Sequence, residues 1–146
     1  MSFKELYYCK TFFDNPNNHT EENYLKAVKQ NGKALQYVQN QTDELCLEAV
    51  KQDGCALQFV QTQTDQICLE AVKKNGMALR FLDNQFNDNQ LTDNQLTDSQ
   101  IKQICLEAVK QNGFALCYVK NQTPQICYYA LKKIQMHKSI LELICI

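Results

Sequence analysis

The pattern of apolar and polar residues repeats along most of the chain. Residues 42–63 read TDELCLEAVKQDGCALQFVQTQ, and residues 64–85 read TDQICLEAVKKNGMALRFLDNQ, which keeps the same pattern at a period of 22 residues. Residues 20–41 form a preceding copy and residues 101–122 a fourth. A fixed period of this length indicates stacked units that bury their apolar faces against one another.

Each unit begins with the pattern of an amphipathic helix. Leu45, Cys46, Ala49 and Val50 share one helical face in the second unit. A threonine precedes each helix and is suited to cap its first turn, with an acidic residue after it at the positive end of the helix dipole. These threonines are Thr20, Thr42 and Thr64, and Thr123 precedes Pro124 in a final partial unit, where proline suits the first helical position.

All the glycines of the chain occupy one repeat position, namely Gly32, Gly54, Gly76 and Gly113. Each follows Asn or Asp after about ten helical residues, which favours a left-handed C-terminal cap and an immediate turn into a second helix. A β-hairpin is the alternative for an Asn-Gly pair, but the flanking residues have a helical period. The second helix is expected to span about seven residues, such as 55–61.

The predicted fold is therefore all-α, a single array of helical hairpins resembling an α-solenoid of the tetratricopeptide type. Residues 1–19 are expected to form an N-terminal cap, residues 20–85 the first three units, residues 101–122 the fourth, and residues 123–146 a partial unit and a C-terminal cap. Gln135 stands where glycine is expected, and Ser139 with Glu142 offers a new helix start. The apolar tail 139–146 is either a buried closing helix or a homodimer contact.

Residues 86–100 interrupt the period. They read FNDNQ LTDNQ LTDSQ, a polar insertion of five-residue units that lengthens the glycine spacing from 22 to 37 residues. The composition favours an exposed loop or a frayed extension. A pentapeptide β-helix is the alternative, since Phe86, Leu91 and Leu96 recur every five residues, but so few units could hardly bury a core.

Composition and charge exclude few classes of function. The formal net charge of −1 gives no global attraction to phosphate or to an anionic membrane. No run of residues is long and apolar enough to span a membrane, and the N-terminus lacks the pattern of a secretory signal, so we expect an intracellular protein. Cys46, Cys68, Cys105 and Cys127 share one repeat position, which indicates a packing site and not a disulfide framework.

Motifs for catalysis, cofactors or metals are absent from the sequence, so we expect a protein that is not an enzyme. His19 and His137 are remote from each other, and the repeated carboxylates Glu48, Glu70 and Glu107 fit a solvated face. The cysteines outside the repeated position have no metal-ligand spacing. They are Cys9, Cys55, Cys117 and Cys145.

Surface recognition is the function that remains. The residue after each glycine differs between units, and so does the residue one turn later; the set is Lys33, Gln36, Cys55, Gln58, Met77, Arg80, Phe114 and Cys117. Variable side chains on a fixed frame are typical of solenoid binding faces for protein partners, although sequence drift explains them equally well.

Nucleic-acid binding is the rival interpretation of the repeated surface. It requires one lysine per unit to align as a basic stripe: Lys29, Lys51, Lys73 and Lys110. It also requires the aromatic ladder to stack on bases instead of filling the core: Tyr37, Phe59, Phe81 and Tyr118.

The pattern L-x-A-V-K-x-N-G-x-A-L-x-Y-V, seen as LEAVKQDGCALQFV and LEAVKQNGFALCYV, resembles an α-helical repeat family of unknown function that is expanded in giant DNA viruses of amoebae. The resemblance covers residues 20 to about 134. It implies a viral protein of the host cytoplasm and, because the five-residue units correspond to a fifteen-nucleotide coding repeat, participation in mimivirus defence against a virophage. It supplies no catalytic residues.

Overall fold

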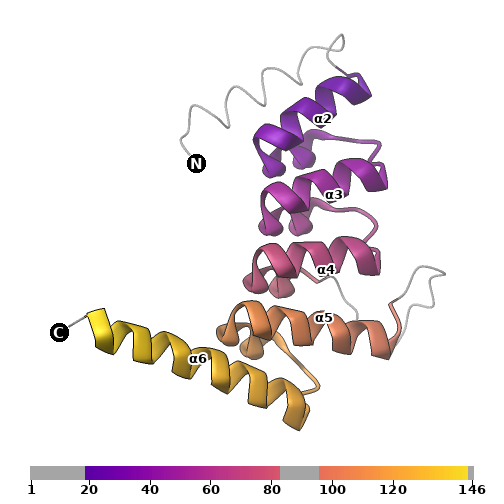
Figure 1. The fold of residues 1–146 in the computed structure, drawn as a ribbon. Helices are drawn as coiled ribbons and strands as arrows, with labels where there is room; N and C mark the ends of the chain where they lie inside the picture. Colours follow the sequence, from indigo (N-terminus) through magenta and orange to yellow (C-terminus); the bar gives the residue numbers. More distant parts are fainter. Residues whose placement is uncertain (1–18, 83–95, 145–146) are drawn as a thin grey trace.

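The protein is an all-α stack of repeated units (Figure 1). The computed structural model describes residues 19–82 and 96–144, with the backbone alone for residues 137–144. Its α-helices are α2 (Glu21–Gln30), α3 (Asp43–Gln52), α4 (Asp65–Lys74), α5 (Asp98–Gln111) and α6 (Pro124–Ile144). Each α-helix contacts the next one along the stack. The predicted N-terminal cap, residues 1–18, lies outside the described residues.

The predicted threonine caps are confirmed. The Thr42 hydroxyl oxygen accepts a hydrogen bond from the Leu45 amide, and Thr20 and Thr64 cap α2 and α4 in the same way. Thr123 accepts from the Ile126 amide at 3.4 Å, with Pro124 in the first position of α6. Each cap satisfies an amide that has no partner within its helix.

The second helix of each unit is a six-residue 3₁₀-helix, not the seven-residue segment predicted from the sequence. The four are η2 (Gly32–Tyr37), η3 (Gly54–Phe59), η4 (Gly76–Phe81) and η5 (Gly113–Tyr118). In η3 the tighter winding begins because the Ala56 amide donates to the Asp53 carbonyl at 2.8 Å. The Asp53 side chain also accepts from the Cys55 amide at 2.9 Å. Asp53 therefore ends α3 and caps η3.

The glycines are not left-handed caps, so that prediction was wrong. None of them has a φ between +20° and +160°, and the preceding Asn or Asp is extended. Glycine is needed because the next unit lies too close for a side chain. A β-carbon on Gly113 would lie 2.5 Å from the Ala130 carbonyl oxygen, and the other glycines face the carbonyls of Ala49, Ala71 and Ala108 in the same way.

Glutamine side chains tie consecutive units together. Gln41 donates to the Phe59 carbonyl at 2.8 Å and accepts from the Gln61 amide at 3.0 Å. Gln63 repeats the first contact with the Phe81 carbonyl at 2.9 Å. Gln52 in turn accepts from the Gly32 amide at 2.7 Å. These bonds pair backbone groups at the unit boundaries that the helices leave without partners.

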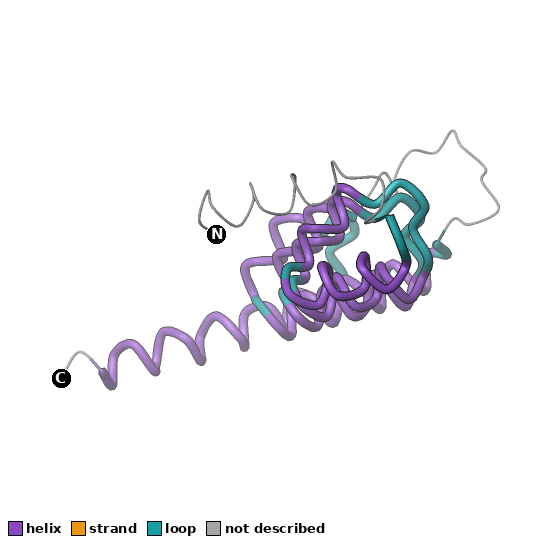
Figure 2. Tube along the Cα trace, turned by 90° about the horizontal axis from the view of Figure 1, so that it is seen from above, coloured by secondary structure: helices purple, strands orange, loops and turns teal. Residues whose placement is uncertain are grey.

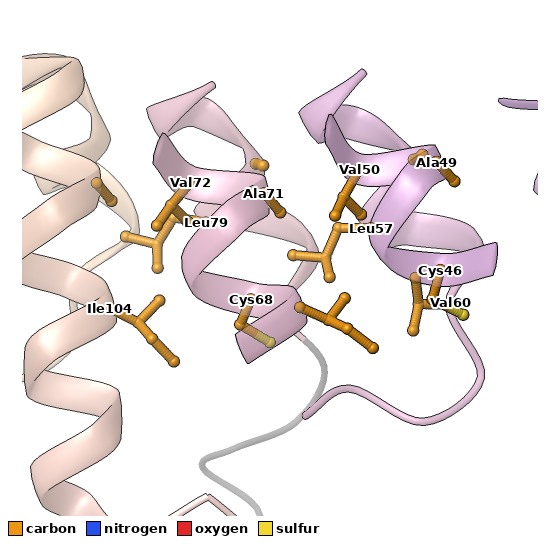
Figure 3. Packing of buried hydrophobic residues seen from close by; sticks show 14 of the residues in the cluster. Cys46, Ala49, Val50, Leu57, Val60, Cys68, Ala71, Val72, Leu79 and Ile104 are labelled. Atoms are coloured by element: carbon orange, nitrogen blue, oxygen red, sulfur yellow. The ribbon is translucent and has the colours of Figure 1, made fainter. Parts of the chain in front are cut away.

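The core is a continuous apolar column between the α-helices and the 3₁₀-helices. Val50 and Leu57 of one unit occupy the same relative places as Val72 and Leu79 of the next (Figure 3). Cys46, Cys68 and Cys105 are buried in it, as predicted for a packing position, whereas Cys127 is half-buried. Seen along the stack, the α-helices overlie one another and so do the loops (Figure 2).

The insertion ends inside a helix. Thr97 and Gln100 form a capping box, so α5 starts at Asp98 and is one turn longer than α3 or α4. The expected loop is therefore wrong for residues 98–100, while residues 83–95 lie outside the described part of the chain. The helix start predicted at Ser139 was also wrong. Helix α6 continues through this residue, because Ile134 and Gln135 replace the Asp-Gly or Asn-Gly pair at which α3 and α4 end.

Candidate interaction surface

The eight candidate residues lie on the four 3₁₀-helices, at the second and fifth position of each. Consecutive 3₁₀-helices contact one another, so the candidate residues follow the stack as two parallel rows, called here the 3₁₀ column. The fifth-position residues are all exposed: Gln36, Gln58, Arg80 and Cys117. In the other row Lys33, Cys55 and Met77 are half-buried and Phe114 is 61% exposed.

The half-buried row makes contacts with the next unit. Lys33 Nζ lies 3.8 Å from a carboxylate oxygen of Asp53, and the Asn75 side-chain amide donates to Cys55 Sγ at 3.2 Å. Two of the residues that vary in this row therefore contact the residue that caps the following 3₁₀-helix. Lys33 contacts Asp53, and Cys55 contacts Asn75. Lys33 and Cys55 have a structural role that the sequence pattern does not reveal.

Gln36, Gln58 and Arg80 of the exposed row contact other residues of their own 3₁₀-helix. Gln36 donates to the Lys33 carbonyl at 3.0 Å, and Gln58 repeats this bond to the Cys55 carbonyl at 2.9 Å. The Arg80 guanidinium lies 4.4 Å from the centre of the Phe81 ring, a cation–π contact. Contacts within one 3₁₀-helix hold these side chains in place and leave their outer surfaces open to a partner.

The repeated lysines lie on successive α-helices, but each pairs with a carboxylate. Lys51 lies 3.0 Å from Glu48, Lys73 pairs with Glu70 at 2.9 Å, and Lys110 pairs with Glu107 at 2.8 Å. Lys29 reaches Glu48 of the next unit at 3.9 Å. Hydrogen bonding to the glutamate raises the pKa of both Lys73 and Lys110. The stripe therefore alternates in sign and is not a basic surface.

Two of the repeated cysteines, Cys46 and Cys105, are poor nucleophiles. Burial raises the pKa of the Cys105 thiol to about 11, and burial together with the charge of Asp43 raises the pKa of Cys46 to about 11. A thiol is reactive as its thiolate, so both groups stay protonated and inert near neutral pH.

The other sequence candidates are not brought together. Among the described side chains, those of residues 19–82 and 96–136, no three His, Cys, Asp or Glu residues form a group that could hold a metal ion. The described cysteines, Cys55 and Cys117 included, are all free thiols. In the aromatic ladder Tyr37, Phe59 and Phe81 pack against the core and Tyr118 is 38% exposed. Cys9 and Cys145 lie outside the described residues, and so does the side chain of His137.

Sequence reasoning missed the exposed apolar side chains of α6 near the C-terminal end of the stack, which are Tyr128, Leu131 and Met136. Among the described residues, the exposed large hydrophobic side chains are Phe114, Tyr118, Tyr128, Leu131 and Met136. The signal that could have found them is the loss of the Asn-Gly pair at positions 134–135, because without it α6 cannot turn into a further 3₁₀-helix. Across the described residues, none of the helices is both long and apolar enough to cross a bilayer.

Comparison with known proteins supports a repeat family whose role is not known. No curated protein and no solved structure matches the chain. Two overlapping stretches, residues 20–63 and 42–87, match the family described as "Domain of unknown function (DUF4116)", and this part of the chain is thus similar to a repeat family of unknown function.

Proposed function

We propose that the protein is a non-catalytic interaction scaffold or adaptor that binds protein partners along the 3₁₀ column. One observation supports this most directly: side chains of different chemistry occupy fixed positions on a constant frame. The frame is the Ala-Leu pair at the third and fourth position of each 3₁₀-helix, which is buried in η2, η3 and η4, whereas the exposed row changes from glutamine to arginine to cysteine.

A rigid frame favours binding because little conformational entropy is lost when a partner docks. The glycine contacts place the start of every 3₁₀-helix against the next unit, and the glutamine bridges hold the last carbonyls of η3 and η4. The chemistry of the column changes along its length, from Lys33 and Gln36 at one end to Phe114 and Cys117 at the other. A partner that spans the column needs polar groups at its first end and apolar groups at its second.

Affinity purification with a matched pair of variants tests the proposal. The column variant carries Gln36→Ala, Gln58→Ala, Arg80→Ala and Cys117→Ala. The control carries Glu44→Ala, Gln66→Ala and Gln103→Ala, which are exposed residues that share one repeat position on the α-helices. After thermal unfolding shows that both variants fold, we expect the wild-type partners to be lost from the column variant and retained by the control.

Two outcomes would contradict the column as a binding face. One is equal recovery of partners by the column variant and the wild-type protein, and the other is the absence of any reproducible partner. Equal loss from both variants would place binding elsewhere on the stack.

We further propose that the scaffold acts in the cytoplasm of cells infected by a giant virus, in defence against a virophage. The support is the resemblance of its repeats and five-residue units to mimivirus proteins. Virophage yield in cells infected with a virus that lacks the coding sequence tests this. Restoring the gene with synonymous codons in residues 86–100 separates the protein from its nucleotide repeat, and we expect the recoded gene to restore defence. Failure to do so would assign the effect to the DNA.

A further inference from the structure

Apolar side chains are exposed on η5 and α6, and α6 lies at the C-terminal end of the stack (Figure 1). We define the terminal surface as Tyr118 on η5 with Tyr128, Leu131 and Met136 on α6. Their exposed fractions are 38%, 60%, 56% and 53%. Tyr128 and Leu131 are one turn apart on α6, and η5 packs directly against this helix. Exposed apolar side chains that gather on neighbouring elements mark interaction sites in soluble proteins.

In the earlier units, the residues at the repeat positions of Tyr128 and Leu131 are covered. Leu131 occupies the position of Val28, Val50, Val72 and Val109 in the earlier units, and each of those valines is 0% exposed. Tyr128 likewise occupies the position of Leu47, Leu69 and Leu106, which are half-buried and pack against the core. The same helical face is thus covered in every earlier unit and open in the last one.

The cover is missing because α6 runs straight on. In α3 the chain turns at Asp53 and Gly54, and η3 then packs back over the helix and its successor. In α6 these two positions are Ile134 and Gln135, so the helix continues and its far end extends beyond the stack (Figures 1 and 2). In the earlier units the corresponding face is covered by a helical element of the repeat, as η3 covers α3 and α4.

The charge around the terminal surface favours one kind of occupant. Residues 113–136 contain Lys120, Lys132 and Lys133 and no Asp or Glu, although the whole chain has 16 acidic residues. On the neighbouring α5, Glu107 is engaged with Lys110 at 2.8 Å. A second copy of the chain would bring the same lysines together on both sides of the contact, which is unfavourable. A partner with acidic residues beside its apolar face would instead be attracted.

We propose that the terminal surface binds an amphipathic helix of a partner protein, with apolar anchors against Tyr128, Leu131 and Met136 and acidic groups facing Lys132 and Lys133. The helix takes the place that a following unit occupies elsewhere in the stack. The terminal surface shares no residue with the exposed row of the 3₁₀ column, although Tyr118 directly follows Cys117, and the peptide titration and the partner purification test the two proposals separately.

Titration of the full chain with three synthetic helical peptides tests the inference, with binding followed by fluorescence anisotropy and located by NMR chemical-shift changes. The first peptide has leucines one turn apart and glutamate flanks, the second replaces the glutamates by lysines, and the third replaces the leucines by serines. We expect the first to bind with shifts confined to residues 113–144 and to weaken as salt rises. We expect the second to bind at least about tenfold more weakly and the third not at all.

Matched variants of the protein complete the test. Leu131→Ala is expected to weaken the first peptide by about tenfold without loss of stability, since Leu131 is largely exposed. Lys132→Gln is expected to weaken it by about twofold to fivefold, and Lys26→Gln, an exposed lysine at the other end of the stack, to leave it unchanged. Equal binding of the first two peptides, or shifts outside residues 113–144, would overturn the proposal. A dimer in light scattering that Leu131→Glu dissociates would overturn it too, in favour of a second copy as the occupant.

Discussion

At the scale of single residues, the closest packing in the fold is the approach of each glycine to the next unit. The Gly54 α-carbon faces the Ala71 carbonyl, and the Asn75 side chain lies beside the same point. There is no space for a methyl group, so the glycine sets how near consecutive units stand.

We predict that Gly54→Ala lowers the free energy of unfolding by about 1–3 kcal/mol because the new methyl group forces the two units apart. Chemical denaturation measures this change. Gln58→Ala, exposed on the same 3₁₀-helix, is the control and should stay within about 0.5 kcal/mol of wild type.

The variant Gly54→Asn separates this account from a left-handed cap. Asparagine is tolerated in left-handed backbone, whereas its larger side chain has even less room against Ala71 than alanine has. We expect Gly54→Asn to be less stable than Gly54→Ala. The reverse order would show that conformation, not packing, selects the glycine.

The sequence pattern identifies the glycine position but not its reason. Residues 54 and 71 are 17 positions apart, and the contact between them depends on how two units dock, which no local preference encodes. The glutamine bridges were predictable in part, because Gln41 and Gln63 are separated by the same 22 residues as the glycines of their units. Their partners, the Phe59 and Phe81 carbonyls, follow only from the stacked backbone.

At the scale of elements, the α-helices follow from the sequence because caps and apolar period agree over ten residues. The 3₁₀-helices do not, because six residues are too few for a period to separate two kinds of winding. The tighter helix is selected by a hydrogen bond in which the side-chain oxygen of Asp53 or Asn75 accepts from the backbone amide two residues ahead.

We predict that the whole unit 42–63 can be deleted without changing the fold. Gln41 would then precede Thr64 and donate to the Phe81 carbonyl in place of that of Phe59, and Gly32 would face Ala71 in place of Ala49. Unfolding should stay cooperative, with a free energy lower by roughly 1–3 kcal/mol for the lost unit.

Deletion of residues 42–52 alone is the control. It removes α3 and leaves η3 next to η2, so the alternation of elements is broken and circular dichroism should report lost helix in the remaining units. Retention of a cooperative transition in this variant, or its loss in the full deletion, would contradict a stack of equivalent units.

At the scale of the whole molecule, the repeated charges on the α-helices of the stack are paired. Lys51, Lys73 and Lys110 each pair with a glutamate of their own helix. Among the described residues, the large apolar side chains that are exposed lie on η5 and α6, at the C-terminal end of the stack.

We predict that nucleic acid does not bind to the lysine stripe at physiological ionic strength, since each lysine would have to give up a carboxylate before it could contact phosphate. Gel shifts over a salt series measure this for single-stranded and duplex DNA. Salt-sensitive retention that Lys51→Gln and Lys73→Gln abolish, and that Lys26→Gln does not, would restore the nucleic-acid interpretation.

The capping box at the start of α5 has a consequence for how the gene can vary. Thr97 and Gln100 both belong to the last five-residue unit, residues 96–100, which directly precedes Ile101. Replication slippage that adds or removes whole five-residue units before residue 96 leaves residues 96–100 in place. Helix α5 therefore starts with the same hydrogen bonds whatever the length of the insertion. The insertion is thus a position where the chain can lengthen or shorten in five-residue steps while the register of every helix that follows is preserved.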